Sequence, residues 1–365
     1  MERRSLAILG AFTFTVALAL AGCSSPSASS TAGASTGVVD LAHYEQLAKA
    51  ATADATWRGP TAPAAAPAGL HVGILVCTVE LEGCRLPMEG IQGAVAKLGW
   101  TEKTVVTSDP GQYSAAFKSI LLDKPAIVFM VGVTQSVVAD GIAQAKAAHI
   151  PVISVFGGNT PGGANGVNAE VQPDKDTMGA AIAAKMIVDL KGKPNAIVLH
   201  DGEFDYEVTA GPTLAACSSC KIAKAIDFTV SELQTTFPTK VVTALQGDPS
   251  INAIYLPFDP PATFLVAALV TAGYGDIPIY TQLGTSGGLN FVRLGKSIVA
   301  DIAAPQKWAG WAGVDAGIRA LAGLPIEPAN LPSKVLTKDN LPPVGQPYDG
   351  DGVDYAAKYM SLWRK

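Results

Sequence analysis

Short apolar runs alternate with amphipathic segments along most of this chain, and this alternation restricts the fold more than any other feature. In the first half the apolar runs are residues 72–76, 103–106, 126–131 and 151–155. The segments between them, 87–98, 112–122 and 135–148, carry apolar side chains at helical spacing. Continuous apolar strands separated by such helices predict a parallel sheet that helices cover on both faces.

The same alternation restarts after residue 170. Strands are expected at 196–199, 221–228, 251–256, 277–281 and 297–302. Helices are expected at 174–190, 206–216, 231–246, 262–272 and 308–321. Two such halves predict two Rossmann-like lobes that face each other. Because ligands of open α/β sheets bind beyond the carboxyl ends of the strands, the facing ends predict a cleft.

The N-terminus predicts export. Arg3 and Arg4 precede an almost wholly apolar run over residues 6–20, which is shorter than a membrane span of ~20 residues but fits the core of a signal peptide. The run ends in Leu-Ala-Gly-Cys at 20–23, which resembles the lipobox of bacterial lipoproteins. That resemblance implies removal of residues 1–22 and acylation of Cys23. A plain secretory signal is the alternative, and either the ordinary or the twin-arginine route can serve.

Residues 23–69 are expected to form a tether and linker. Residues 24–37 are rich in Ser, Ala, Thr, Gly and Pro, residues 38–52 have the spacing of a short helix, and 59–69 are rich in Pro and Ala. No later apolar run is long enough to cross a membrane, so the expected anchor is lipid alone. These features predict a location on the extracytoplasmic face of the cell membrane.

Composition limits the function classes. Hydrophobic residues make up 48% of the chain, and the ~300 residues beyond the tether can bury the cores of two domains. The net charge of −5 argues against a nucleic-acid partner, because neutralising phosphates needs a basic face.

Four cysteines remain when Cys23 is set aside: Cys77, Cys84, Cys217 and Cys220. An even number in an exported chain indicates disulfides, and local pairing is the simplest of the three possible connectivities. The Cys-Ser-Ser-Cys spacing at 217–220 also occurs in redox motifs, but it lies near a helix end, which favours a structural clip. A zinc site built from all four is the remaining alternative, although exported thiols tend to oxidise first.

Five stretches carry a resemblance to a known family: residues 71–76, 90–100, 145–154, 267–273 and 296–302. In their order and spacing the chain resembles the two-lobed periplasmic binding proteins of the ribose type, which serve ABC importers. Cys77 and Cys84 resemble the paired cysteines of an actinobacterial branch of these lipoproteins. The resemblance implies an α/β fold of two Rossmann-like lobes with parallel sheets, joined by a three-strand hinge (periplasmic binding protein type I).

The resemblance also implies domain boundaries. Lobe 1 would comprise residues 70–168 and 305–333, and lobe 2 would comprise 169–304 and 334–365. The chain would cross between the lobes near residues 168, 304 and 334, and the lobes would close on a ligand by hinge bending.

The cleft departs from the pattern of pentose-binding relatives. Phe156 and Gly157 stand where those proteins have an Asp-Arg pair, and Phe258-Asp259 replaces an Asn-Asp pair. Gly284 and Ala304 replace a third Asp and a hinge glutamine. A sugar needs many polar partners, because each buried hydroxyl left unpaired costs about 1–3 kcal/mol. These replacements leave the cleft with fewer such partners.

Candidate ligand-binding residues follow the predicted strand ends. They are Glu80, Phe156, Asn159, Asp205, Tyr206, Phe258, Asp259 and Gln282. Aromatic walls with carboxylates favour a flat or cationic ligand, held by stacking and cation–π attraction. The alternative is that the two phenylalanines are core residues and the acids are solvated. Trp308 and Trp311 have the helical spacing of core packing.

These observations predict a lipid-anchored solute-binding protein that delivers a small molecule to an ABC permease and its ATPase. The ligand would be sugar-like by family, or aromatic or amine-bearing by the altered site. We expect a monomer with no enzymatic activity, no cofactor and no bound metal. The alternatives are an exported α/β hydrolase, which would need paired carboxylates, and a ligand sensor for a membrane kinase.

Overall fold

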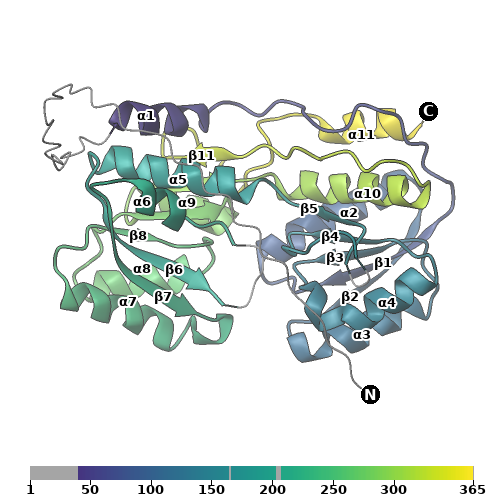
Figure 1. Ribbon diagram of the computed structural model, residues 1–365, viewed down its shortest axis with the longest axis horizontal. Helices are drawn as coiled ribbons and strands as arrows, with labels where there is room; N and C mark the ends of the chain where they lie inside the picture. Colours follow the sequence, from purple (N-terminus) through teal and green to yellow (C-terminus); the bar gives the residue numbers. More distant parts are fainter. Residues whose placement is uncertain (1–39, 164–165, 203–206, 365) are drawn as a thin grey trace, which may run out of the picture. The chain divides into compact units, whose positions relative to one another are not determined.

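The computed structural model describes residues 40–163, 166–202 and 207–364 (Figure 1). The expected signal peptide, Cys23 and the tether up to residue 39 lie outside the described residues. None of the described helices has the length and hydropathy of a membrane-spanning segment.

Lobe 1 is built on a five-stranded parallel sheet with the order β2-β1-β3-β4-β5. Its strands are β1 (His71–Val76), β2 (Thr101–Val106), β3 (Val128–Val131), β4 (Val152–Val155) and β5 (Ala169–Val171). The connecting helices are α2 (Glu82–Lys97), α3 (Tyr113–Leu121) and α4 (Ala139–Ala147), with single 3-10 turns at Pro110–Gln112 and Gln135–Val138. All side chains of β3 and β4 are buried, as expected for central strands covered on both faces.

Lobe 2 has a six-stranded sheet with the order β11-β10-β9-β8-β6-β7. Its strands are β6 (Asn195–Asp201), β7 (Lys221–Phe228), β8 (Ala253–Tyr255), β9 (Ile279–Leu283), β10 (Ile298–Ala303) and β11 (Lys334–Leu336). Only β11 is antiparallel to its neighbour. The helices are α5 (Lys175–Asp189), α6 (Gly211–Ala216), α7 (Thr236–Gly247), α8 (Ala262–Thr271) and α9 (Ser286–Leu294), with a 3-10 turn at Val230–Glu232.

Between β1 and β11 the chain crosses from one lobe to the other three times. The chain enters lobe 2 between β5 and α5, returns between β10 and α10 (Gln306–Leu321), and enters lobe 2 again between α10 and β11. The buried indoles of Trp308 and Trp311 in α10 belong to the core of lobe 1, which confirms the expected core packing.

The C-terminal helix lies in a different lobe from the one expected. The sequence-based boundaries place residues 334–365 in lobe 2, whereas α11 (Tyr355–Trp363) contributes Tyr359, Leu362 and Trp363 to the core of lobe 1. The chain therefore crosses a further time between β11 and α11. The physical reason is aromatic packing, because the Trp363 ring stacks on Trp311 with ring centroids 5.6 Å apart.

The linker before β1 also contacts both lobes. Helix α1 (Leu41–Ala50) packs Leu41 and Tyr44 on the core of lobe 2. Residues 51–67, the N-terminal strap, then pass to lobe 1, where the N–H groups of Ala64 and Ala66 donate to the carbonyls of Leu362 and Trp363 (Figure 1). The lobes are thus tied by more of the chain than a three-strand hinge.

Candidate ligand-binding cleft

A small cavity lies where the carboxyl ends of strands from the two sheets approach each other. It encloses about 80 Å³. Lobe 1 contributes Leu81, Gly83, Cys84, Gly132 and Phe156, and lobe 2 contributes Phe258, Pro260, Gln282 and Leu283. These residues follow β1, β3, β4 and β8, or end β9, so the cavity occupies the position that the topology predicts for a ligand.

Two of the facing residues have a strained backbone. Phe156 in lobe 1 has φ 55° and Leu283 in lobe 2 has φ 121°, both in the left-handed half of the map that non-glycine residues avoid. Such conformations cost about 1–3 kcal/mol each and gather at binding sites, where the surrounding structure holds them. Their occurrence on opposite walls of one cavity supports a binding role for that cavity.

A disulfide closes the wall on the side of lobe 1. Cys77 at the end of β1 is bonded to Cys84 in the first turn of α2, and the loop between them carries Leu81 and Glu82. Gly132 packs against this bridge with φ 62°, and a Cβ at that position would lie 2.5 Å from the Cys77 sulfur. The second pair, Cys217 and Cys220, is bonded between α6 and β7. Both disulfides therefore have the local pairing that was the simplest of the three connectivities expected from the sequence.

The turn that carries Phe156 is held by two side chains, the buried Asn159 and the partly buried Glu170. Asn159 donates from Nδ2 to the Val133 carbonyl and to Ser154 Oγ, both at 2.8 Å. The carboxylate of Glu170 in β5 accepts the backbone N–H groups of Gly157 at 3.1 Å and Asn159 at 3.0 Å. Burial raises the pKa of Glu170 to about 7, and these hydrogen bonds oppose the rise. Both residues therefore position Phe156.

On the side of lobe 2, Asp259 organises the N-terminus of α9. One carboxylate oxygen accepts the Thr285 N–H and the other accepts the Thr285 hydroxyl, both at 2.8 Å. Burial, with a smaller contribution from the neighbouring charge of Glu82, raises the pKa of Asp259 to about 6. Asp301, also buried, accepts the Gly284 N–H at 3.0 Å, and burial together with Asp259 raises its pKa well above the usual range.

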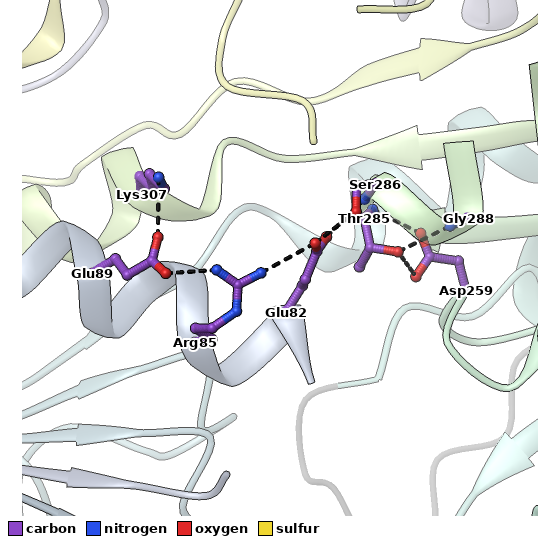
Figure 2. A network of polar contacts seen from close by, with 8 residues as sticks. All are labelled: Glu82, Arg85, Glu89, Asp259, Thr285, Ser286, Gly288 and Lys307. Atoms are coloured by element: carbon purple, nitrogen blue, oxygen red, sulfur yellow. Dashed lines mark hydrogen bonds and ion pairs between the residues drawn. The ribbon is translucent and has the colours of Figure 1, made fainter. Parts of the chain in front are cut away.

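One polar network crosses the cleft (Figure 2). The carboxylate of Glu82 in α2 accepts the N–H and the hydroxyl of Ser286 in α9, each at 2.7 Å. Within lobe 1, Arg85 contacts Glu82 at 3.2 Å and Glu89 at 2.6 Å, and Lys307 of α10 contacts Glu89 at 3.0 Å. We call the Glu82–Ser286 pair the latch. Its members are 204 residues apart in sequence and come from different lobes.

The structure brings some of the predicted site residues together and separates others. Phe156, Phe258 and Gln282 line the cavity. Asn159 and Asp259 lie behind it and bond to protein groups, while Glu80 is exposed and accepts a hydrogen bond from the Thr78 hydroxyl, which lowers its pKa. Asp205 and Tyr206 lie outside the described residues.

Sequence reasoning missed several residues of the cleft. They are Leu81, Glu82, Pro260, Leu283 and Ser286. The available signal was position, because Leu81 ends the loop after β1, Glu82 begins α2, and Leu283 ends β9 just before α9.

A larger cavity of about 1060 Å³ lies on the hinge side. It is lined by the N-terminal strap, by residues 168–174 of the first connection and by residues 326–333 of the third. This cavity therefore lies against two of the connections between the lobes.

Two α/β lobes joined by several connections, with a cavity between facing strand ends, define the class of hinged solute-binding proteins. Residues 72–325 match the periplasmic binding protein domain, and the chain belongs to that family. The expected type I fold is therefore confirmed. Membership supports an extracytoplasmic solute-binding role over an enzymatic one. No curated protein matches the sequence.

Solved structures share the fold at low identity. A glucose-galactose binding protein from Geobacillus stearothermophilus has a TM-score of 0.65 and 17% identity, covering 76% of this chain and 100% of its own. An ABC sugar transporter subunit from Rhodobacter sphaeroides has a TM-score of 0.63 and 21% identity over 75% and 99%. A 5-methylthioribose transporter solute-binding protein from Thermotoga lettingae has a TM-score of 0.65 and 17% identity, covering 82% of this chain and 95% of its own.

Proposed function

We propose that this chain is a lipid-anchored receptor that binds a small organic solute between its lobes and delivers it to an ABC permease with its ATPase. The observation that carries the proposal is the cavity between strand ends of both lobes, with strained residues on its opposite walls. Hinge bending opens such a site for entry and closure sequesters the solute.

The cavity lining does not favour the hydrolase alternative. Its described side chains are apolar except for the amide of Gln282, and Cys84 is bonded to Cys77, so it offers no thiol. Hydrolysis by carboxylates needs two such groups facing one substrate bond. Binding without turnover is the activity that this lining supports.

The decisive experiment is a thermal-shift screen of the mature protein against sugars, polyols, amines and aromatic acids, followed by mass spectrometry of each solute that binds. A ligand at about 100 times its Kd stabilises the folded state by about 2.7 kcal/mol. We expect a stabilised complex from which the solute is recovered unchanged. Recovery of a hydrolysed solute would favour the enzyme instead.

The anchor is tested separately. The motif around Cys23 supports acylation, so the wild-type protein should incorporate radiolabelled palmitate and partition into detergent. Cys23→Ser should abolish the label and release the protein from membranes. A Cys23→Ser protein that stays in the membrane fraction would contradict a lipid anchor at this residue.

A further inference from the structure

We propose that the ligand is a small, largely apolar solute with a single ring, and that the latch, rather than ligand hydroxyls, holds the lobes together. This inference rests on the proposed function, because it names the class of solute that the same cavity receives. Four observations support it: the lining, the commitment of nearby polar groups, the latch and the size of the cavity.

The lining is that of an apolar pocket. Leu81 and Phe156 face the cavity from lobe 1, and Phe258, Pro260 and Leu283 face it from lobe 2. The Cys77–Cys84 bridge adds a further apolar wall through Cys84. Aromatic and aliphatic side chains on opposing walls bind a flat apolar group by burial and by offset stacking.

Three polar side chains at the cavity, those of Asn159, Asp259 and Gln282, already bond to protein groups. Asn159 is held by Val133 and Ser154, and both oxygens of Asp259 accept from Thr285. The amide nitrogen of Gln282 donates to the Pro257 carbonyl at 2.7 Å. A sugar in this cavity would bury several hydroxyls without partners, and each one lowers affinity by roughly tenfold.

The latch supplies the hydrogen bonds across the cleft that a hydroxylated ligand would otherwise have to make. Contacts within each lobe already orient the two partners, Glu82 and Ser286. Arg85 orients Glu82 within lobe 1, and Asp259 fixes Thr285, the N-cap of α9, within lobe 2. Closure then needs no reorganisation at Ser286, whose N–H is one of the groups that a helix N-terminus leaves without a backbone acceptor.

The size of the cavity limits the solute. About 80 Å³ is far below the roughly 300–1,000 Å³ of common ligand pockets, and within a factor of about two of the ~150 Å³ apolar cavity that binds benzene in an engineered protein. A larger polar ligand would hold the lobes apart and separate Glu82 from Ser286. The small volume of the cavity and an intact latch together select a small ring.

The first test is calorimetry with defined probes: phenol, benzyl alcohol and aniline against glucose, galactose and myo-inositol. We expect measurable Kd values for the three aromatic probes only. Phe156→Leu and Phe258→Ala should weaken the best probe by at least tenfold. The matched control Phe264→Ala removes a half-buried phenylalanine on α8, outside the cavity lining, and should leave the Kd unchanged.

The second test removes the latch. Glu82→Gln and Ser286→Ala should raise the radius of gyration of the ligand-free protein in small-angle scattering, and should weaken every ring probe by a common factor of about ten without changing their order. Asp140→Asn removes a carboxylate from an exposed site on α4 and serves as the charge-matched control. Unchanged scattering and affinities in both latch variants would refute the role of the latch.

The outcomes separate this inference from the proposed function. Tight binding of a sugar with no binding of ring compounds would overturn the ligand class and leave the receptor function standing. Failure of every solute in the wider screen would overturn the receptor function itself. Circular dichroism of each variant checks that it is folded, so that a loss of affinity can be assigned to the change in the cavity or the latch.

Discussion

Glu170 and Asn159 are joined directly behind Phe156, where the carboxylate of Glu170 accepts the backbone N–H of Asn159 at 3.0 Å. The same carboxylate accepts the N–H of Gly157, so one side chain of β5 fixes two of the three residues that follow the strained Phe156. A strained backbone conformation persists only when surrounding groups hold it in place. The two hydrogen bonds to Glu170 hold this turn.

This arrangement predicts a pH-dependent stability. The folded-state pKa of Glu170 is about 7, above its usual value of 4.5, so the folded protein holds the proton more tightly. The resulting contribution of about 3 kcal/mol is fully present below pH 4.5 and is lost as pH rises to about 7. Urea denaturation should show a steeper fall for wild type than for Glu170→Gln across this range. Parallel pH profiles would contradict the assignment.

Gly132 should tolerate no side chain, for two separable reasons. Gly132 and Gly99 have nearly the same φ, 62° and 67°, but a Cβ at Gly132 would clash with the Cys77 sulfur, whereas the space around Gly99 is open. Gly99→Ala should lower the free energy of unfolding by about 1–2 kcal/mol through backbone strain alone. Gly132→Ala should lower it by a further 1–3 kcal/mol, roughly, through overpacking. Equal losses by chemical denaturation would exclude the clash.

The two disulfides should differ in their local effect. By chain entropy, replacing either pair with alanines should lower the free energy of unfolding by about 2–3 kcal/mol. Only the Cys77→Ala/Cys84→Ala variant should also lose amide-exchange protection around Glu82 and Gly83, because only that bridge clips the loop carrying the latch. The Cys217→Ala/Cys220→Ala variant is the control, and loss of protection there as well would contradict the prediction.

Arg319 of α10 should be essential for stability. Its guanidinium is 2% exposed and contacts Asp315 at 2.7 Å, Glu327 at 3.1 Å and the Ala62 carbonyl of the N-terminal strap at 2.6 Å. Arg319→Met would leave the equally buried Asp315 without its cation, at a cost of about 3–5 kcal/mol. The exposed Arg58 offers the control, since Arg58→Met should change stability by less than about 0.5 kcal/mol. Thermal unfolding compares the two.

The two-lobed fold was predictable because its signals are local. Apolar runs such as 128–131 become buried strands where helical segments separate them. The three expected crossings between the lobes came from the family resemblance and not from this pattern. Helix α9 escaped prediction because Gly287 and Gly288 lower helix propensity. In the structure Gly288 is needed, since a Cβ there would lie 2.1 Å from Asp259. That requirement comes from a residue 29 positions earlier and has no local signature.

The site was less predictable than the fold. Phe156, Phe258 and Gln282 could be chosen because they follow strand ends, and strand ends converge. Sequence position does not show which way a loop side chain turns, and so it could not separate Asp259, which bonds inward to Thr285, from a residue facing the cavity. Glu82 was invisible for another reason, because its partner Ser286 lies in the other lobe.

The lobe that α11 completes is assembled from widely separated parts of the chain. Tyr359, Leu362 and Trp363 fill the same core as Val72 and Ile74 of β1, and the strap pairs with the end of α11. The hydrophobic interior of lobe 1 therefore cannot be completed before α11 has been synthesised, so this lobe folds only after most of lobe 2 has left the ribosome.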